Sequence, residues 1–397
     1  MTTSTQTEPA SYPFDEASGL SVAPGFAAAR RTAGMIRVQT PYGEPAWLAA
    51  RYEDARFVLA DRRFSRAAAK EHDEPRLSAG MLGEGILSMD PPDHTRLRTL
   101  VAKAFTGRRV ELMRPRIREL AAGLIDDMIV AGPPVDLVEA FALPLPVAVI
   151  CELLGVPVAD RPKFRAWSDA LLSTSRITAE RFGQIRVDFR AYLHELIEQR
   201  RAEPRDDLMT ALIEARDERD RLSEVELVDL CRTVLIAGHE TTATQLPNFV
   251  HVLLESPQRW AELRANPDLI PAAVEELTRF VPIASNASFA RYATEDVEVG
   301  GVLVRAGEPV LVAFSSANRD ETRFADPDEL RFDRPDNQHI GFGHGVHHCL
   351  GAQLARAELQ EALRMLLARL PALHHAGEVV WKTEMLVRGA RAMPVGW

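Results

Sequence analysis

Cys349 lies near the end of a short segment in which glycine occupies the alternate positions 341, 343 and 345. Residues 340–350 read I-G-F-G-H-G-V-H-H-C-L, and residues 352–370 have the composition of a strong helix. Because glycine reaches backbone conformations that other residues rarely adopt, the segment predicts a tight loop that can approach a flat ligand closely. The loop delivers Cys349 to the start of a helix, where backbone N–H groups and the helix dipole favour a thiolate over a thiol.

The spacing of these residues can be compared with the motifs of dinucleotide-binding and zinc-binding sites. A dinucleotide-binding fingerprint needs G-x-G-x-x-G, but the sixth position counted from Gly343 is His348, and no parallel strand–helix unit surrounds it. Zinc fingers and ribbons supply paired cysteines a few residues apart, whereas His344, His347 and His348 here accompany a single cysteine. The spacing excludes the dinucleotide site, and a zinc site or a buried structural cysteine stays open.

A long apolar helix is predicted from Ser223, which forms a capping-box pattern with Glu226, to about Leu254. Its middle reads A-G-H-E-T-T, which places Glu240 and Thr241 inside a strongly apolar run. Polar groups in such a helix are costly to bury unless they have a partner or a task. The structural alternative is that Glu240 pairs with a cation and that Thr241 bonds back to the carbonyl four residues earlier.

The rest of the chain predicts a mainly helical protein with minor β-sheets. Residues 179–201 repeat apolar side chains at steps of three and four, the pattern of a helix packed on one face. Valines alternate on both sides of residues 300–301, two glycines, which predicts a β-hairpin. Further strands are expected at residues 36–38, 47–49 and 309–313 and as a pair between 379 and 395. No linker or repeat divides the chain, so one domain over residues 1–397 is expected, with residues 1–12 disordered.

Composition restricts the partners and the location that are expected. Forty-seven Lys and Arg against 57 Asp and Glu give a formal net charge of −10, which argues against nucleic acid bound through its phosphates. Three cysteines in 397 residues do not make a disulfide framework. The most apolar stretch, residues 140–151, is well short of the about 20 residues that a membrane span needs, and residues 1–10 show no export pattern. A monomeric cytoplasmic protein is expected.

A ten-residue pattern, F-G-x-G-x-H-x-C-x-G, is complete in this chain and resembles the haem-binding loop of the cytochrome P450 family. It is filled by Phe342, Gly343, Gly345, His347, Cys349 and Gly351. Three more motifs of the family occur in the expected order, so the resemblance covers nearly the whole chain. It implies a single-domain cytochrome P450 fold and haem b as cofactor, with Cys349 as the ligand of the iron. The cofactor-binding residues that it implies are His94, Arg98, Ala237, Arg291, Phe342, Gly343, His347, Cys349 and Gly351.

Haem carries two propionates, and a chain of net charge −10 must hold them with local cations. His94 and Arg98 are four residues apart and therefore share a helix face. With two later residues, Arg291 and His347, they match the propionate-binding positions of P450s. The resemblance also implies a buried charge network with a stabilising role beneath the haem loop, formed by Glu276, Arg279 and Arg334.

The resemblance implies a haem-thiolate monooxygenase, which inserts one O2-derived oxygen atom into a C–H or C=C bond. Thr241 would hydrogen-bond the oxygen at the iron and Glu240 would help relay protons, while Ala237 and Gly238 would leave room over the iron. Electrons from NAD(P)H would arrive through a ferredoxin reductase and a ferredoxin. The cation excess of residues 103–118 is the expected docking site, although a solvated helix face explains it equally simply.

The expected pocket walls are mostly apolar and contain small residues, which predicts a bulky, weakly polar substrate. They are residues 81–88, 171–175, 236–237, 282–288 and 385–387. The motifs resemble those of bacterial P450s that tailor polyketides, particularly macrolide hydroxylases and epoxidases of antibiotic biosynthesis, with a terpenoid or steroid as the alternative. A peroxide-driven peroxygenase would not need the acid–alcohol pair. A non-enzymatic haem sensor would normally carry a second axial ligand or an output module.

Overall fold

The computed structural model describes residues 8–14, 19–32, 35–78, 85–172, 178–217, 221–284 and 289–397. Its α-helices are α1 (Pro24–Arg31), α2 (Tyr52–Ala60), α3 (Asp93–Ala102), α4 (Gly107–Ala131), α5 (Pro144–Leu154), α6 (Arg161–Leu171), α7 (Ala179–Ala202), α8 (Leu208–Asp217), α9 (Glu224–Leu254), α10 (Pro257–Ala265), α11 (Ile270–Phe280), α12 (Phe314–Ala317) and α13 (Ala352–Arg369). Shorter helical turns are η1 (Ala67–Glu71), η2 (Gly85–Ser88), η3 (Lys103–Phe105), η4 (Val138–Ala142), η5 (Val158–Asp160), η6 (Pro267–Leu269) and η7 (Gly345–His347).

The strands are short and lie in four separate groups. They are β1 (Ala10–Ser11), β2 (Met35–Gln39), β3 (Ala46–Ala49), β4 (Phe64–Ser65), β5 (Val135–Asp136), β6 (Arg291–Ala293), β7 (Val297–Val299), β8 (Val302–Val304), β9 (Pro309–Val312), β10 (His374–His375), β11 (Val380–Trp381), β12 (Ala390–Ala392) and β13 (Pro394–Gly396). The largest sheet has the order β1-β2-β3-β9-β6-β4. The smaller groups are β10-β13-β5, β11-β12 and β7-β8.

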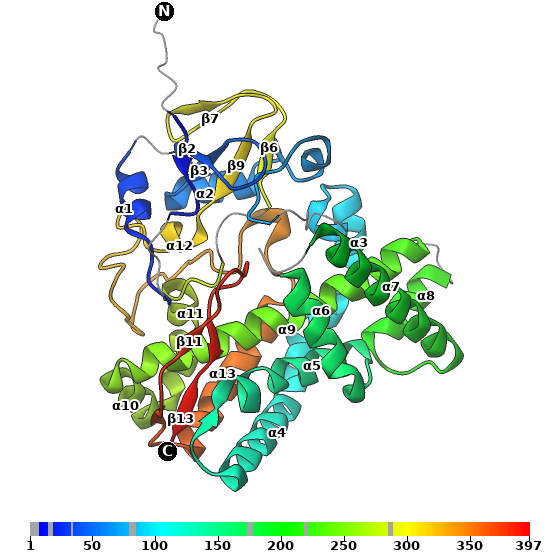
Figure 1. Ribbon diagram of the computed structural model, residues 1–397, viewed down its shortest axis with the longest axis vertical. Helices are drawn as coiled ribbons and strands as arrows, with labels where there is room; N and C mark the ends of the chain where they lie inside the picture. Colours follow the sequence, from blue (N-terminus) through cyan, green and yellow to red (C-terminus); the bar gives the residue numbers. More distant parts are fainter. Residues whose placement is uncertain are drawn as a thin grey trace, which may run out of the picture.

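The six-stranded sheet is buried on both faces, because successive side chains of a strand point to opposite sides. Leu48 and Leu311 belong to one apolar cluster, and Ala49 and Val310 belong to another. Strands β1–β2 and β3–β9 run parallel, and the other neighbours are antiparallel. This sheet, which lies at the top of Figure 1, fixes β6 and with it the first residue of β6, Arg291.

The helices form the larger part of the molecule, with α9 running through its middle (Figure 1). Contacts with α5, α7 and α13 cover α9 on several sides. The predicted capping box is confirmed, since the Ser223 hydroxyl accepts from the N–H of Glu226 at 3.2 Å and the Glu226 carboxylate accepts from the N–H of Ser223 at 2.7 Å. The mainly helical class, the hairpin at residues 300–301 (β7–β8) and the late strand pair (β11–β12) are confirmed as well.

The expected disorder of residues 1–12 is wrong for the last of them. Ala10 and Ser11 form β1 and pair in parallel with β2, so the edge of the sheet supplies their backbone with partners. Tyr12 is 1% exposed, and its ring packs edge-on against those of Phe14 and Phe26. A strand of two residues is too short to leave a sequence pattern. Residues 1–7 lie outside the described residues.

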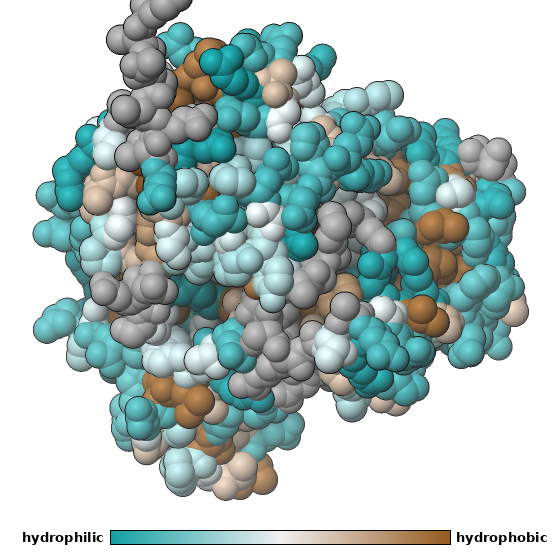
Figure 2. All heavy atoms as spheres, turned by 45° about the horizontal axis from the view of Figure 1, so that its top comes forward, coloured by the Kyte–Doolittle hydropathy of each residue, from teal (hydrophilic) through white to brown (hydrophobic). Residues whose placement is uncertain are grey.

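Hydrophilic side chains cover most of the face seen in Figure 2, and apolar side chains gather there only in small separate groups. Among the helices of the described residues, none combines the length and the apolar character that crossing a bilayer requires.

Candidate active site

The Cys349 loop is closed by a backbone hydrogen bond and by a glycine that cannot be replaced. The N–H of Cys349 donates to the carbonyl of Phe342 at 2.8 Å. Gly345 has a φ of +70°, and a β-carbon there would lie 2.2 Å from the carbonyl oxygen of Leu59, so any side chain is excluded. Helix α13 begins at Ala352, three residues after the cysteine. The predicted delivery of Cys349 to the start of a helix is confirmed.

The other residues of the pattern hold this loop against its neighbours. The guanidinium of Arg356 lies 4.4 Å from the centre of the Phe342 ring. The N–H of Gly343 donates to the carbonyl of Ile340 at 2.9 Å. Gly351 is the N-cap residue of α13, and the ring of Phe105 in η3 lies 3.9 Å from the position of a β-carbon on this glycine. The ring of Phe105 therefore packs beside Gly351 at the start of α13, two residues after the cysteine.

The ionisation of Cys349 is set by more than the helix start. One side of the residue is accessible to solvent, but dense protein surrounds the rest, and this burial raises the pKa of its thiol. The N–H of Gly351 and the charges of Arg98 and Arg356 act in the opposite direction. Burial therefore opposes the predicted effect of the helix start on the pKa of the thiol, whereas the N–H of Gly351 supports that effect. Ligation of a metal cation by this sulfur would also favour the thiolate, since metal ligation deprotonates a thiol.

The four predicted propionate ligands come from three elements and lie together. Helix α3 supplies His94 and Arg98, β6 supplies Arg291 and η7 supplies His347. The ring centres of His94 and His347 are 4.3 Å apart. Burial, and after it the charges of Arg98 and Arg291, lowers the pKa of His94. The side chain of Arg98 also donates to the carbonyl of His348 at 2.6 Å, which ties α3 to the cysteine loop.

Two members of this group, Arg291 and His347, have few hydrogen-bond partners in the protein. Arg291 is 7% exposed, and its guanidinium donates to the carbonyl of Phe289 over a long 3.4 Å. Burial first, and then the charge of Arg66, lowers the pKa of Arg291 to about 9. Nε2 of His347 is buried and has no hydrogen-bond partner among the described residues. Buried polar groups left in this way are costly, and an anion between them would satisfy both. The residues therefore fit the propionates of a haem.

Ala237 and Thr241 mark the accessible face of α9. They lie one helical turn apart and are exposed, although most residues of this helix are buried. The Thr241 hydroxyl donates to the carbonyl of Ala237 at 3.1 Å, as the structural alternative predicted. Gly238 faces α5 instead, where a β-carbon would lie 2.4 Å from Cδ1 of Ile150. Gly238 thus serves helix packing, and its implied role in leaving room over the iron stays a prediction.

Glu240 has a cationic partner that the sequence did not identify, Lys382. The Lys382 ammonium donates to Oε1 of Glu240 at 2.8 Å and to the hydroxyl of Thr244 at 2.8 Å. Glu240 is 3% exposed, so this pairing offsets the cost of burying its charge. The structural alternative for Glu240 is also confirmed. Lys382 directly follows β11, 142 residues away along the chain, so no local pattern could signal the contact.

The described parts of the predicted pocket walls meet through backbone hydrogen bonds. The N–H of Leu386 donates to the carbonyl of Leu172 at 2.9 Å, and Ala284 pairs with Val387 in an isolated bridge. The turn η2 packs against α9. Residues 171–172, 282–284 and 385–387 therefore lie together as predicted, and residues 85–88 lie against the helix that carries residues 236–237. The remaining wall positions, 81–84, 173–175 and 285–288, lie outside the described residues.

The predicted charge network is buried and centred on Glu276. Arg279 donates to the two carboxylate oxygens at 2.7 and 2.8 Å, and Nε of Arg334 donates to them at 3.1 Å. The side chains of Glu276 and Arg279 are fully buried. The N–H of Arg331 and the amide of Asn337 also donate to Glu276, at 3.0 and 3.2 Å. The network therefore fixes the segment that leads into the cysteine loop.

We expect Glu276→Ala to lower the free energy of unfolding by about 3–5 kcal/mol, because removing one partner of a buried pair leaves the other charge uncompensated. Denaturant titration of the haem-loaded protein measures the loss. A matched control is Glu262→Ala, which removes the exposed Arg259–Glu262 pair of the same spacing and should cost less than about 1 kcal/mol. Equal losses in the two variants would show that the network contributes no special stability.

Three comparisons with known proteins agree with this geometry. The family model for cytochrome P450 matches residues 147–386. The chain is 52% identical to the mycinamicin IV hydroxylase/epoxidase of Micromonospora griseorubida and 51% identical to the nocardicin C N-oxygenase of Nocardia uniformis subsp. tsuyamanensis, over 99% of this chain and 100% of each relative. The crystal structure of HinD with NMFT and NO superposes with a TM-score of 0.96 at 49% identity, covering 98% of this chain and 100% of that one.

The chain belongs to the cytochrome P450 family. It has the single-domain P450 fold that the sequence predicted, and it is a monooxygenase that depends on a haem iron. Haem iron, rather than zinc, is the metal that this family uses.

Proposed function

We propose that the chain binds haem b with Cys349 as the ligand of the iron and that His94, Arg98, Arg291 and His347 hold the propionates. The observation that carries this proposal is the convergence of these four side chains, in which the buried Arg291 is weakly paired and the buried Nε2 of His347 is unpartnered. When bound, the haem iron supplies the activation of O2. The protein supplies the sulfur donor, the cations and the shape of the surrounding space.

We further propose that Thr241 and Glu240 handle protons for the reaction. Thr241 is supported by its exposure on the accessible face of α9, where its hydroxyl can hold a proton donor at Oγ1. The carboxylate of Glu240 is bonded to Lys382 and Thr244 rather than to Thr241. A relay through Glu240 therefore requires this carboxylate to exchange partners, and Lys382 positions it until then.

The proposed substrate is a macrolide or related polyketide that is hydroxylated or epoxidised in antibiotic biosynthesis. The apolar walls with small residues support a bulky, weakly polar molecule. The relative named for mycinamicin IV supports the same class, while the equally similar relative named for nocardicin C provides the contrasting substrate. A binding titration followed by the haem spectrum, with a macrolide panel and nocardicin C as its two arms, decides between them. Tighter binding of nocardicin C than of every macrolide would overturn the macrolide assignment.

The reaction itself is tested by product formation with NAD(P)H, a ferredoxin and a ferredoxin reductase, compared with peroxide alone. We expect product only in the first mixture, because the acid–alcohol pair serves O2-dependent chemistry. Equal product with peroxide alone would identify a peroxygenase. Binding without turnover in either mixture would identify a sensor.

We place the ferredoxin on the cations at the start of α4. Lys103, Arg108 and Arg109 are exposed. They lie close in the chain to Phe105, whose ring packs beside Gly351 at the end of the cysteine loop. Within the part of the chain that the structure describes, Arg109 makes no ion pair. Arg116, by contrast, pairs with Glu152 and Glu119, each at 2.7 Å. Of Arg109 and Arg116, which both lie in the predicted docking segment, Arg109 is therefore the better probe.

We expect Arg109→Glu to slow electron transfer from the ferredoxin about tenfold at low salt, because complementary charge steers the encounter. The difference should shrink as the screening length falls from about 30 Å at 0.01 M to about 8 Å at 0.15 M ionic strength. Stopped-flow reduction of the haem protein measures it. Arg305→Glu makes the same charge change on an exposed residue after β8 and should have no effect. Strand β8 pairs with β7, which lies at the opposite end of Figure 1 from α4. An unchanged rate for Arg109→Glu would remove the ferredoxin from this surface.

A further inference from the structure

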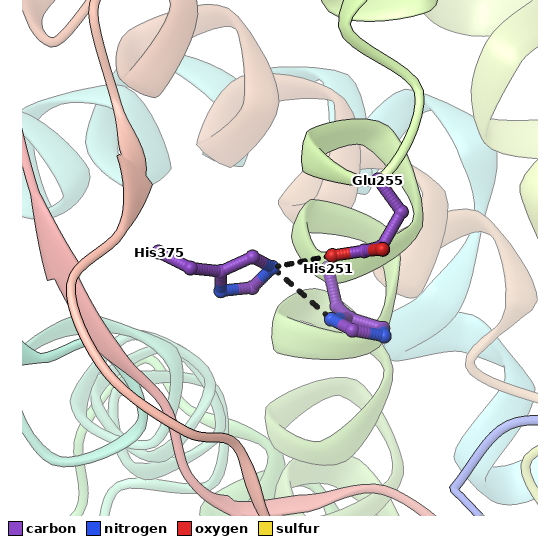
Figure 3. Close-up of side chains that lie close together, drawn as sticks. All are labelled: His251, Glu255 and His375. Atoms are coloured by element: carbon purple, nitrogen blue, oxygen red, sulfur yellow. Dashed lines mark hydrogen bonds and ion pairs between the residues drawn. The ribbon is translucent and has the colours of Figure 1, made fainter.

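Two histidines and a glutamate converge where the last turn of α9 meets β10 (Figure 3). Nδ1 of His251 and Nε2 of His375 are 3.2 Å apart, and Nε2 of His375 is 3.5 Å from Oε1 of Glu255. The three ligand atoms all lie within 4.8 Å of one another. His251 and Glu255 share one face of α9 because they are four residues apart, whereas His375 approaches from a different element.

These distances match the edges of a tetrahedral zinc site. With Zn–N and Zn–O bonds of about 2.0–2.2 Å, two ligands at the tetrahedral angle lie about 3.3–3.5 Å apart. The two closest separations here are 3.2 and 3.5 Å, and the third edge closes by a small rotation of Glu255, whose side chain is 63% exposed. Two imidazoles and one carboxylate are a frequent zinc ligand set that leaves one position for water.

The position in the fold also favours a cation. His251 lies in the last turn of α9 and Glu255 is its C-cap residue, so the negative end of a long helix dipole points at the site. Trp381 packs edge-on against His251 with ring centres 5.0 Å apart, which shields one side. His251 is ten residues beyond Thr241, or about 15 Å along the helix. The cluster is therefore separate from the Cys349 loop and takes no part in its chemistry.

We propose that His251, Glu255 and His375 form a binding site for a divalent transition metal, with Zn²⁺ as the ion that the geometry fits. The bound ion joins the end of α9 to the strands that close the chain. Nδ1 of His375 is buried and has no hydrogen-bond partner among the described residues. Zinc ligands normally have such a partner, and its loss lowers affinity about 10–100-fold. Binding of Zn²⁺ should therefore be about 10–100-fold weaker than at a site whose histidines all have such partners.

The test is a calorimetric titration of the haem-loaded protein with ZnCl2, after treatment with a chelator and its removal. The wild-type protein should bind one Zn²⁺ at this site. His375→Gln and Glu255→Gln each remove a zinc ligand, so each should weaken that binding by more than the about 10–100-fold that the loss of an outer partner costs. Because Glu255 is exposed, its variant keeps the fold even where a change at His375 does not.

His374→Gln is the matched control, since this neighbouring histidine is bonded to the carbonyl of Ala372 and lies outside the cluster. The carbon-monoxide spectrum of each variant confirms that the haem is retained.

Binding that is lost in both ligand variants and unchanged in His374→Gln supports the site. Absence of binding in the wild-type protein overturns it, and so does binding that survives Glu255→Gln and His375→Gln undiminished.

Discussion

Replacing Cys349 by serine should eliminate the absorption band that sulfur-ligated haem shows after reduction and treatment with carbon monoxide, and should lower product formation below detection. A serine hydroxyl keeps the size of the side chain but does not donate electron density to iron as a thiolate does. The loop itself should survive, because it is closed by the N–H of residue 349 and by Gly345 rather than by the sulfur. Reduced carbon-monoxide difference spectroscopy and a product assay measure the two effects.

The matched control for this prediction is Cys231→Ala. Cys231 lies in α9, is fully buried, and burial raises the pKa of its thiol to about 12, so it is a thiol with no iron to bind. This variant should keep the band and the activity, with at most a small loss of stability from the missing sulfur. A band that persists in Cys349→Ser would show that another residue is the ligand and would withdraw the haem-binding roles that depend on Cys349.

The features that the sequence predicted correctly are those specified by residues close together in the chain. The capping box needs Ser223 and Glu226, the hairpin needs two glycines between valines, and the cysteine loop needs ten neighbouring residues. Each of these structures follows from local backbone geometry, so the pattern and the fold agree. The fold class followed from the order of such motifs together with the resemblance to a known family.

Contacts between distant segments were not visible in the sequence. Lys382 reaches Glu240 because β11 lies beside α9, and nothing near either residue encodes that placement. The thiol pKa of Cys349 depends on how much protein surrounds it, which only the folded chain determines. Gly238 is a similar case. The resemblance gave it a role in leaving room over the iron, but its packing against Ile150 of α5 could not be seen in the sequence. Burial and long-range pairing therefore set the properties that local patterns left open.

Replacing Thr241 by alanine should lower product formation about 100-fold while NAD(P)H continues to be consumed and hydrogen peroxide accumulates. A positioned proton donor contributes on the order of 10²–10⁴ to such a reaction. Thr241→Ser, which keeps a hydroxyl on the same face of α9, should restore most of the product.

Glu240→Gln keeps the size of the side chain and an acceptor for Lys382 but cannot release a proton, so it should lower product formation with the same rise in peroxide. Product formed per NAD(P)H consumed measures all three.

The control for Thr241→Ala must separate proton delivery from the loss of a helix hydrogen bond. Thr233 provides it, because its hydroxyl donates to the carbonyl of Asp229 at 2.7 Å, four residues earlier on the same helix, as Thr241 does to Ala237 at 3.1 Å. Thr233→Ala removes the same kind of bond two turns away and should leave the ratio of product to NAD(P)H unchanged. If both alanine variants lower that ratio equally, the hydroxyl of Thr241 acts on the helix and not on the reaction. A normal ratio in Thr241→Ala would likewise remove Thr241 from the proton pathway and leave its exposed position on α9 without a catalytic role.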